Sequence, residues 1–347
     1  MQSADFETTF HMDVDGMDAP TRPPGTQDAV ERIPPRGARG RAGWIQANRL
    51  ISAILCIAGC AASHAPPSPS PNPPRTQIVI LGSGTPIADP ERQGPSVAIV
   101  VDGVSYIVDA GAGVVRRGAA TKIEALRARN MKLVFLTHLH SDHTLGYPDL
   151  LLSGAVLHRG APLVAYGPHG LRDMTDHLLA AWKKDIELRV NGLERGDAQA
   201  YAVDVHEVAP GVVYRDDKVT VRAFLVKHGS WDEAFGYRFD TPDRSIVFSG
   251  DTAPTDAVVE ACNGCDVLIH EVYSRAGFET LPPGDQRYHA AFHTSAPELA
   301  ALAAKARVKT LVLHHQLFFG QTESELIDEV RRGFRGNVVS AHDLQTL

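Results

Sequence analysis

The stretch over residues 133–146, LVFLTHLHSDHTLG, constrains the fold of this chain more than any other. It opens with an unbroken apolar run, which predicts a buried strand, and continues into three histidines and one aspartate. On an extended backbone, residues two apart project to the same side, so His138 and His140 can hold one ion. Asp142 and His143 follow directly and can turn toward a second ion. Imidazole and carboxylate groups are ligands for Zn²⁺ and similar divalent metals.

The composition is that of an ordinary globular protein. The chain has 347 residues, of which 44% are hydrophobic and 22% charged, and could form one large domain or two. The net charge of −7 argues against a general nucleic-acid binder, which normally carries a basic face. Four cysteines are too few for a disulfide scaffold. We expect Cys262 and Cys265 to pack at the end of a helix, with a disulfide in an oxidising compartment as the alternative.

The first 76 residues differ in composition from the rest of the chain. Residues 1–60 combine a polar, Gly/Pro/Arg-rich segment, which we expect to be disordered, with an apolar run that is too short to cross a membrane and suits a signal peptide. That run ends in Ile57-Ala-Gly-Cys60, which resembles a bacterial lipobox, so Cys60 is the expected lipidation site. Residues 61–76 form a Pro/Ser-rich linker. We therefore expect an exported, membrane-anchored lipoprotein; a plain secretory signal, or a cytoplasmic protein with a misread N-terminus, are the alternatives.

The second half of the chain offers further metal ligands, each after an apolar strand. The strand pattern over residues 219–226 leads into His228, and Ser245-Ile-Val-Phe-Ser-Gly places Asp251 at the end of another strand. The strand that starts at Lys309 ends in the pair His314-His315.

The His-x-His-x-Asp-His pattern resembles the signature of the metallo-β-lactamase fold superfamily. Two further strings, Leu-Gly-Ser-Gly-Thr-Pro over residues 81–86 and Phe-Gly-Tyr-Arg over residues 235–238, resemble the ribonuclease Z-like branch. The resemblance covers residues 77–347 and implies an α/β hydrolase domain, an αββα sandwich with a dinuclear metal site at the sheet edge.

This resemblance implies two Zn²⁺ ions, although Mn²⁺ or Fe accept the same ligands. The first ion would be held by His138, His140 and His228, the second by Asp142, His143 and His315, with Asp251 as the bridge. His315 rather than His314 matches the family position.

The resemblance also implies the chemistry. A metal-bridging hydroxide would attack the ester, and Asp142 would orient it or take its proton. His293 would protonate the leaving group or stabilise the oxyanion. Asp109 and Glu271 would support the ligands from behind.

The metal motif does not name the substrate. In ribonuclease Z, a long arm that grips tRNA lies between two strands that are joined here by only the turn within Phe239–Ser245. The chain therefore looks closer to arm-less phosphodiesterases and arylsulfatases. We expect hydrolysis of phosphodiester or sulfate-ester bonds in a small molecule, no nucleic-acid partner, membrane contact only through a lipid anchor, and a possible homodimer. The alternative is a tRNA 3′-processing endoribonuclease, and a third hypothesis is a binding module without activity.

Overall fold

The computed structural model describes residues 74–347. The expected disordered and signal segment over residues 1–60, most of the linker over residues 61–76 and the lipidation site Cys60 lie outside the described residues. Within the described range, no helix is both long enough and apolar enough to cross a membrane.

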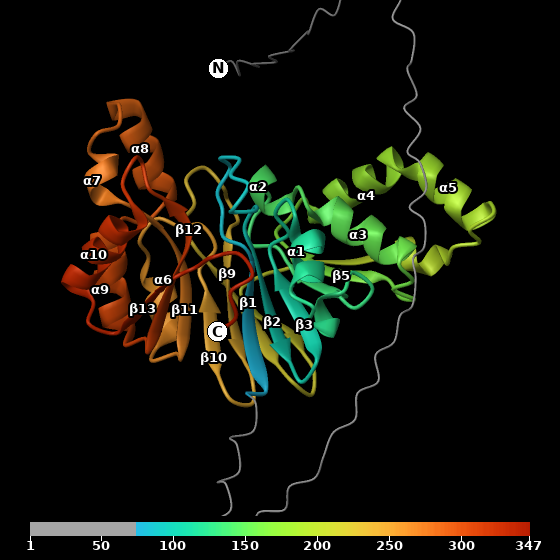
Figure 1. The fold of residues 1–347 in the computed structure, drawn as a ribbon, viewed down its shortest axis with the longest axis horizontal. Coiled ribbons are helices and arrows are strands. Elements are labelled where there is room, and N and C mark those ends of the chain that lie inside the picture. Colours follow the sequence, from blue (N-terminus) through green and yellow to red (C-terminus); the bar gives the residue numbers. More distant parts are fainter. Residues whose placement is uncertain (1–73) are drawn as a thin grey trace, which may run out of the picture. The chain divides into compact units, whose positions relative to one another are not determined.

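Two β-sheets form the centre of the domain (Figure 1). In each sheet the strands lie side by side in chain order, or in its reverse. The first sheet contains β1 (Thr76–Gly82), β2 (Ser96–Val101), β3 (Val104–Val108), β4 (Leu133–Phe135), β5 (Leu163–Gly167) and β6 (Val203–Glu207). The second sheet contains β7 (Gly211–Arg215), β8 (Thr220–Leu225), β9 (Phe235–Asp240), β10 (Ser245–Phe248), β11 (Val267–Tyr273), β12 (Thr310–Leu317) and β13 (Asn337–Ser340).

The core lies in three apolar layers. Side chains from both sheets, such as Ile80, Phe135 and Phe239, pack together between them. The outer face of each sheet carries a second set of apolar residues that is covered by helices. The first sheet is covered by α1 (Val114–Ala120), α3 (Tyr147–Val156) and α4 (Leu171–Ala181), followed by α5 (Lys183–Asn191). The second is covered by α6 (Asp256–Cys262), α9 (Ala296–Ala306) and α10 (Glu323–Gly333). The αββα sandwich expected from the sequence is confirmed.

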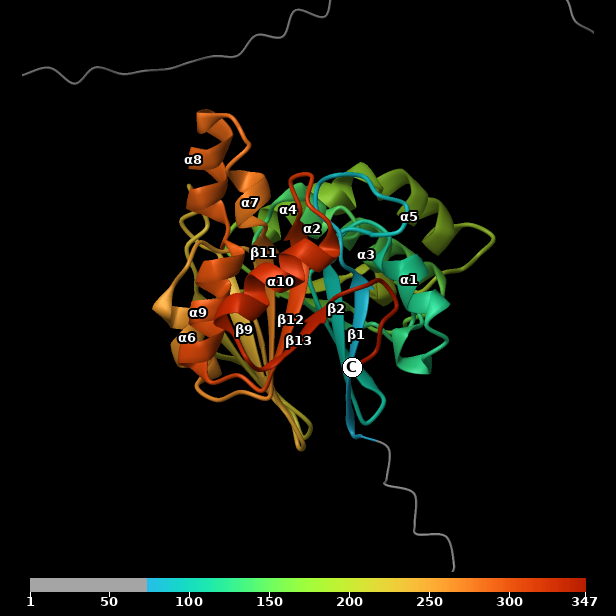
Figure 2. The ribbon, with the colours of Figure 1, turned by 60° about the vertical axis from the view of Figure 1, so that its left-hand side comes forward.

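Parallel pairing brings the polar strand ends to one edge. Strands β3, β4 and β5 run parallel, as do β10, β11 and β12, so the carboxyl ends within each set meet at the same edge. Three short helices gather at this edge: α2 (Ser141–Thr144), α7 (Arg275–Phe278) and α8 (Pro283–Phe292). Figure 2 shows α7 and α8 rising beyond the strands of the second sheet.

Several local predictions can be compared with the structure. The sequence Asp102-Gly103 predicts a hairpin turn, and these residues do form the turn between β2 and β3; both adopt positive φ, 45° and 79°, as a tight hairpin requires. The disulfide alternative holds for Cys262 and Cys265, which are bonded to each other at the end of α6. Strands β9 and β10, which are joined by the turn within Phe239–Ser245, form a hairpin, as expected.

Two local predictions are wrong. The sequence over residues 121–130 predicts a helix, but only Glu124–Leu126 form a single 3₁₀ turn there, because Ile123 and Arg127 have extended backbone on either side of that turn. Residues 278–291, predicted to be a loop that walls the pocket, contain most of α8 instead of a loop, although Tyr288 and His289 of this helix do line the cavity described below. Pro283 in its first turn fits a helix start, since that position needs no backbone donor.

Candidate metal centre

Three histidines from two elements converge at the edge described above. His138 and His140 follow β4, and His228 follows β8. The Nε2 atoms of His138 and His228 lie 3.0 and 3.1 Å from Nδ1 of His140. Zinc–nitrogen bonds of 2.0–2.1 Å in a tetrahedron place neighbouring ligands about 3.3 Å apart. The three nitrogen atoms therefore fit a common divalent ion.

A second group of donors lies beside the first. Oδ2 of Asp142 is 3.2 Å from Nε2 of His315 and 3.5 Å from Nε2 of His143. Oδ2 of Asp251 is 3.4 Å from Nε2 of His143 and 3.5 Å from Nε2 of His315. Donor atoms of Asp251, His138 and His143 also lie within 4.8 Å of one another, so Asp251 reaches toward both groups. The structure brings together all seven candidate ligands.

The pair at the end of β12 is separated by a break in the strand register. Glu271 of β11 pairs with His314 and Val272 pairs with Gln316, which leaves His315 as the extra residue of a bulge. His315 adopts φ 44°, an uncommon conformation for this residue type, and its side chain enters the cluster. Nε2 of His314 instead lies 2.8 Å from the carbonyl oxygen of Gly82. The bulge therefore assigns the two histidines to different partners.

Asp109 orients the metal-ligating histidines through hydrogen bonds. Its Oδ1 accepts the backbone N–H of Thr137 at 2.8 Å, and its Oδ2 accepts Nδ1–H of His143 at 2.8 Å. The Thr137 hydroxyl donates to the same carboxylate and accepts Nδ1–H of His138 at 2.9 Å. These bonds leave the Nε2 atoms of both histidines bare toward the cluster, which is the form that binds a metal.

The electrostatics of the cluster also suit a cation. Burial lowers the pKa of His138 far below its ordinary value and that of His228 to about 4. Burial raises the pKa of Asp251, but the neighbouring His315 and His143 outweigh burial and hold it well below the ordinary range. At neutral pH these two histidines are therefore neutral and Asp251 is ionised, and those are the ligating forms of both groups.

His293 and Glu271 lie next to the ligands. Nδ1 of His293 is 3.2 Å from Oε2 of Glu271, whose Oε1 accepts the backbone N–H of Thr294 at 2.7 Å. Burial lowers the pKa of His293 to about 4 and raises the pKa of Glu271 well above its ordinary value. Donor atoms of His293, Asp251 and His315 lie within 4.8 Å of one another, so the geometry also allows His293 to serve as a ligand.

A cavity of about 230 Å³ opens onto this cluster. Its lining includes side chains from α8, which lies within the segment expected to wall the pocket, and side chains at the end of β12 that the sequence gave no reason to select. Neither apolar periodicity nor a motif marks these positions, because they come together only through the fold. The lining residues are Pro86, Ile87, His140, Asp142, Asp251, Tyr288, His289, His293, His315, Leu317 and Phe319.

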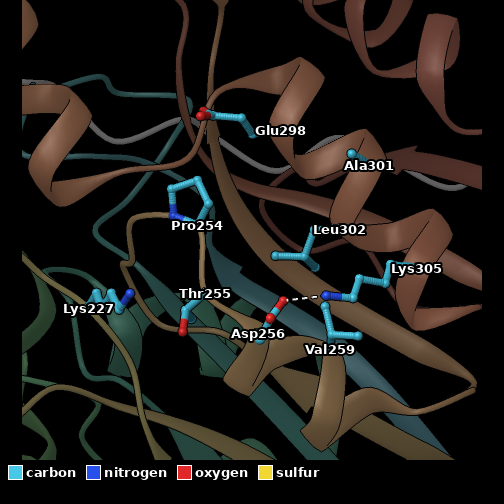
Figure 3. A pocket seen from close by; sticks show the side chains of 9 residues that line it. All are labelled: Lys227, Pro254, Thr255, Asp256, Val259, Glu298, Ala301, Leu302 and Lys305. Atoms are coloured by element: carbon cyan, nitrogen blue, oxygen red, sulfur yellow. Dashed lines mark hydrogen bonds and ion pairs between the residues drawn. The ribbon is translucent and has the colours of Figure 1, made fainter.

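A larger hollow, of about 520 Å³, lies between α6 and α9 (Figure 3). Three of its four charged residues already have partners: Nζ of Lys305 is 2.7 Å from Asp256, and Glu298 closes the capping box at the start of α9. None of its lining residues is a histidine. Despite its volume, this hollow is therefore not the metal centre.

The chain is similar in sequence to a known family and to named proteins. The family model described as Beta-lactamase superfamily domain matches residues 105–316. Ribonuclease Z of Mycobacterium marinum is 35% identical over 243 residues, which cover 69% of this chain and 85% of that protein. Ribonuclease Z of Mycobacterium avium is 34% identical over 275 residues, which cover 77% and 96%.

Two solved structures share the fold. The metallo-β-lactamase fold protein YhfI from Bacillus subtilis has a TM-score of 0.60 at 18% identity and covers 78% of this chain and 98% of its own. The short form of human tRNase Z has a TM-score of 0.59 at 23% identity, with the same coverage.

These relatives overturn one expectation. We expected a small-molecule ester as substrate and no nucleic-acid partner, and this is wrong, because the relatives that match most of the domain are named ribonucleases. The expectation rested on the short β9–β10 turn and on the net charge of −7. Total charge averages over the whole chain and does not report the potential at one edge, and an arm at one position is only one way to hold RNA.

Proposed function

This chain belongs to the beta-lactamase superfamily, in its ribonuclease Z-like branch, and we propose that it is an endoribonuclease that hydrolyses a phosphodiester bond near the 3′ end of tRNA precursors. One observation carries the proposal. Two groups of metal-ligating side chains, with Asp251 reaching toward both, lie at the strand ends of a domain that is 35% identical to a ribonuclease Z.

The metal content is part of the proposal. We assign one zinc ion to His138, His140 and His228, and a second to Asp142, His143 and His315, with Asp251 between them. Manganese or iron fits the same nitrogen and oxygen donors. When bound, such ions supply Lewis acidity that polarises a phosphoryl oxygen and generates a nucleophile from water at neutral pH.

Protein groups around the ions complete the reaction. Oε2 of Glu271 lies 3.2 Å from Nδ1 of His293, and burial raises the pKa of this carboxyl well above its ordinary value. When Glu271 carries its proton and donates it to Nδ1, the hydrogen of neutral His293 lies on Nε2, on a ring that lines the cavity. His293 can then donate to the leaving oxygen as charge develops there.

Asp142 has the complementary role. It lines the cavity, and although burial raises its pKa, the neighbouring His315 and His143 lower it below the ordinary value. An ionised Asp142 can accept a proton from the attacking water or fix its orientation.

Cleavage of a defined RNA tests the proposal. The zinc-loaded protein is incubated with a tRNA precursor that carries a 3′ trailer, and the products are mapped at single-nucleotide resolution. We expect one principal cut, which disappears with a chelator and with Asp251→Asn. His169→Ala is the matched control, because His169 is an exposed histidine paired with Glu233. An intact precursor, under conditions in which the protein hydrolyses bis(p-nitrophenyl) phosphate, would reject the proposal.

A further inference from the structure

We propose that the apolar half of the cavity beside the metal centre is a nucleobase-binding subsite, in which Tyr288 of α8 and Phe319 after β12 stack on a base. The choice of a nucleobase rests on the proposed function, whereas the subsite itself rests on the geometry described below.

The cavity has two chemically different sides. One side is formed by the metal-ligating residues and His293, and the other by Ile87, Tyr288, His289, Leu317 and Phe319, with Pro86 at the edge. None of the lining residues is a lysine or an arginine. Binding of an anion is therefore confined to the metal side, and the other side suits an uncharged ring attached to the phosphate group held there.

The Phe319 wall is fixed in place. Phe319 packs in a cluster with Tyr273 and Leu317, and its ring centroid lies 4.6 Å from that of His289. Its backbone meets α7 so closely that a Cβ atom at Gly277 would lie 2.7 Å from the Phe319 carbonyl oxygen. A wall that is already ordered loses little conformational entropy when a ligand binds.

Helix α7 is itself anchored. The buried carboxylate of Glu329 accepts the backbone N–H of Arg275 at 2.7 Å and that of Ala276 at 3.0 Å, at the first turn of α7. This capping by α10 holds the α7 backbone against Phe319 and so fixes one side of the subsite.

The Tyr288 wall is exposed but tied to the metal centre. Tyr288 is 47% exposed, and its ring centroid lies 4.5 Å from that of Phe292. Phe292 packs over Gly229, where a Cβ atom would lie 2.0 Å from its ring, and its carbonyl oxygen accepts Nδ1–H of His228 at 2.9 Å. One residue thus links the exposed tyrosine to a metal-ligating histidine.

Two of the side chains that line the cavity expose apolar surface beside the polar metal centre. Ile87, which also lines the cavity, is 72% exposed, so Ile87 and Tyr288 both present apolar surface to solvent near the metal centre. Single-stranded RNA is bound largely by stacking of unpaired bases on aromatic side chains, which tolerates any base because every base has a π-face. A base attached to the phosphate at the metal side would cover this surface.

The experiment compares two phosphate ligands that differ only in the base. Titration calorimetry on the full-length, zinc-loaded protein gives the dissociation constants of adenosine 5′-monophosphate and ribose 5-phosphate. We expect the nucleotide to bind roughly 10- to 100-fold more tightly, as one stacked base contributes. Tyr288→Ala should reduce this ratio about tenfold or more, and Tyr288→Phe should retain it. Trp182→Ala, which removes a partly exposed aromatic residue outside the cavity, should also retain it.

The ratio cancels any effect that is common to both phosphates, such as altered metal affinity. Equal affinities in the wild type, or a ratio unchanged by Tyr288→Ala, would overturn the subsite. If Tyr288→Ala does not fold, as judged by its thermal melt, Ile87→Ser at the 72% exposed position gives the same test and should lower the ratio. Binding needs no cleavage, so an intact ratio with uncut RNA rejects only the proposed function, and cleaved RNA with no ratio rejects only the subsite.

Discussion

Substitution of Asp109 by asparagine tests how the protein prepares its metal ligands. Asp109 is fully buried, and each of its carboxylate oxygens accepts a hydrogen bond from a different N–H group. Oδ1 accepts from the backbone of Thr137, and an asparagine carbonyl at that position keeps this bond. Oδ2 accepts Nδ1–H of His143, where the asparagine would present an NH₂ group instead. Two donors would then face each other at 2.8 Å.

The conflict is relieved if His143 moves its hydrogen to Nε2. That atom faces Asp142 and Asp251 and has no hydrogen-bond partner in the described part of the protein, and a protonated Nε2 cannot bind a metal. Loss of such outer partners typically lowers metal affinity by 10- to 100-fold. We therefore expect the zinc affinity of Asp109→Asn to fall by about 1.4–2.8 kcal/mol.

Competition with a chromogenic chelator measures this affinity. Glu329→Gln is the matched control: Glu329 is also a buried carboxylate that accepts several hydrogen bonds, but it caps α7 and lies outside the metal-ligating groups. We expect this control to lose stability and keep its zinc affinity. An unchanged zinc affinity in Asp109→Asn, or an equal loss in both variants, would refute the tautomer argument.

Three further predictions concern other parts of the domain. His315→Ala should remove about one equivalent of bound zinc. His314→Ala should keep the zinc but lose about 1–3 kcal/mol of stability, because the buried carbonyl at the end of β1 loses its hydrogen-bond partner. The opposite pattern in metal analysis would reverse the assignment of the two histidines. Burial raises the pKa of Asp266, but a lysine ammonium and the start of β10 outweigh burial and lower it to about 2. Its folded pKa is below its unfolded pKa, so its contribution is present above about pH 4 and is lost as the pH falls through about 2. In urea unfolding, Asp266→Asn should cost about 1–2 kcal/mol at pH 7 and little near pH 2, and a cost independent of pH would contradict this. Reduction of the Cys262–Cys265 bond should lower the stability of the domain by about 2 kcal/mol or less, because the closed loop is short. Zinc binding should stay unchanged, and loss of zinc on reduction would contradict this prediction.

Sequence alone could predict the elements that are determined by residues close together in the chain. The run from His138 to His143 follows a buried strand, and helix α10 shows its capping pattern at Thr322, so both are readable without the fold. The sandwich and the approach of His228 and Asp251 followed from a resemblance, since nothing local says which strand ends meet. The choice between His314 and His315 depends on a bulge in β12, which is set by its pairing with β11.

Other features depend on tertiary structure alone. The aromatic wall of Tyr288 and Phe319 joins segments that have no shared sequence pattern, and α8 begins at two prolines that read as a loop. The proposed RNA partner was only the alternative in the sequence analysis, because charge summed over the chain and one missing arm are both remote from the reacting edge. The sequence analysis predicted only a supporting role for Glu271, without naming its partner. The 3.2 Å between Glu271 and His293 comes from the packing of β11 against the start of α9.

The most direct test of the account is cleavage of a tRNA precursor by the zinc-loaded protein, with the cut site mapped and the bound metal quantified in the same sample. We expect one principal cut near the 3′ end of the tRNA, about two zinc ions per chain, and loss of both cleavage and metal in His138→Ala. A fully metallated protein that leaves the precursor intact while it hydrolyses small phosphodiesters would contradict it.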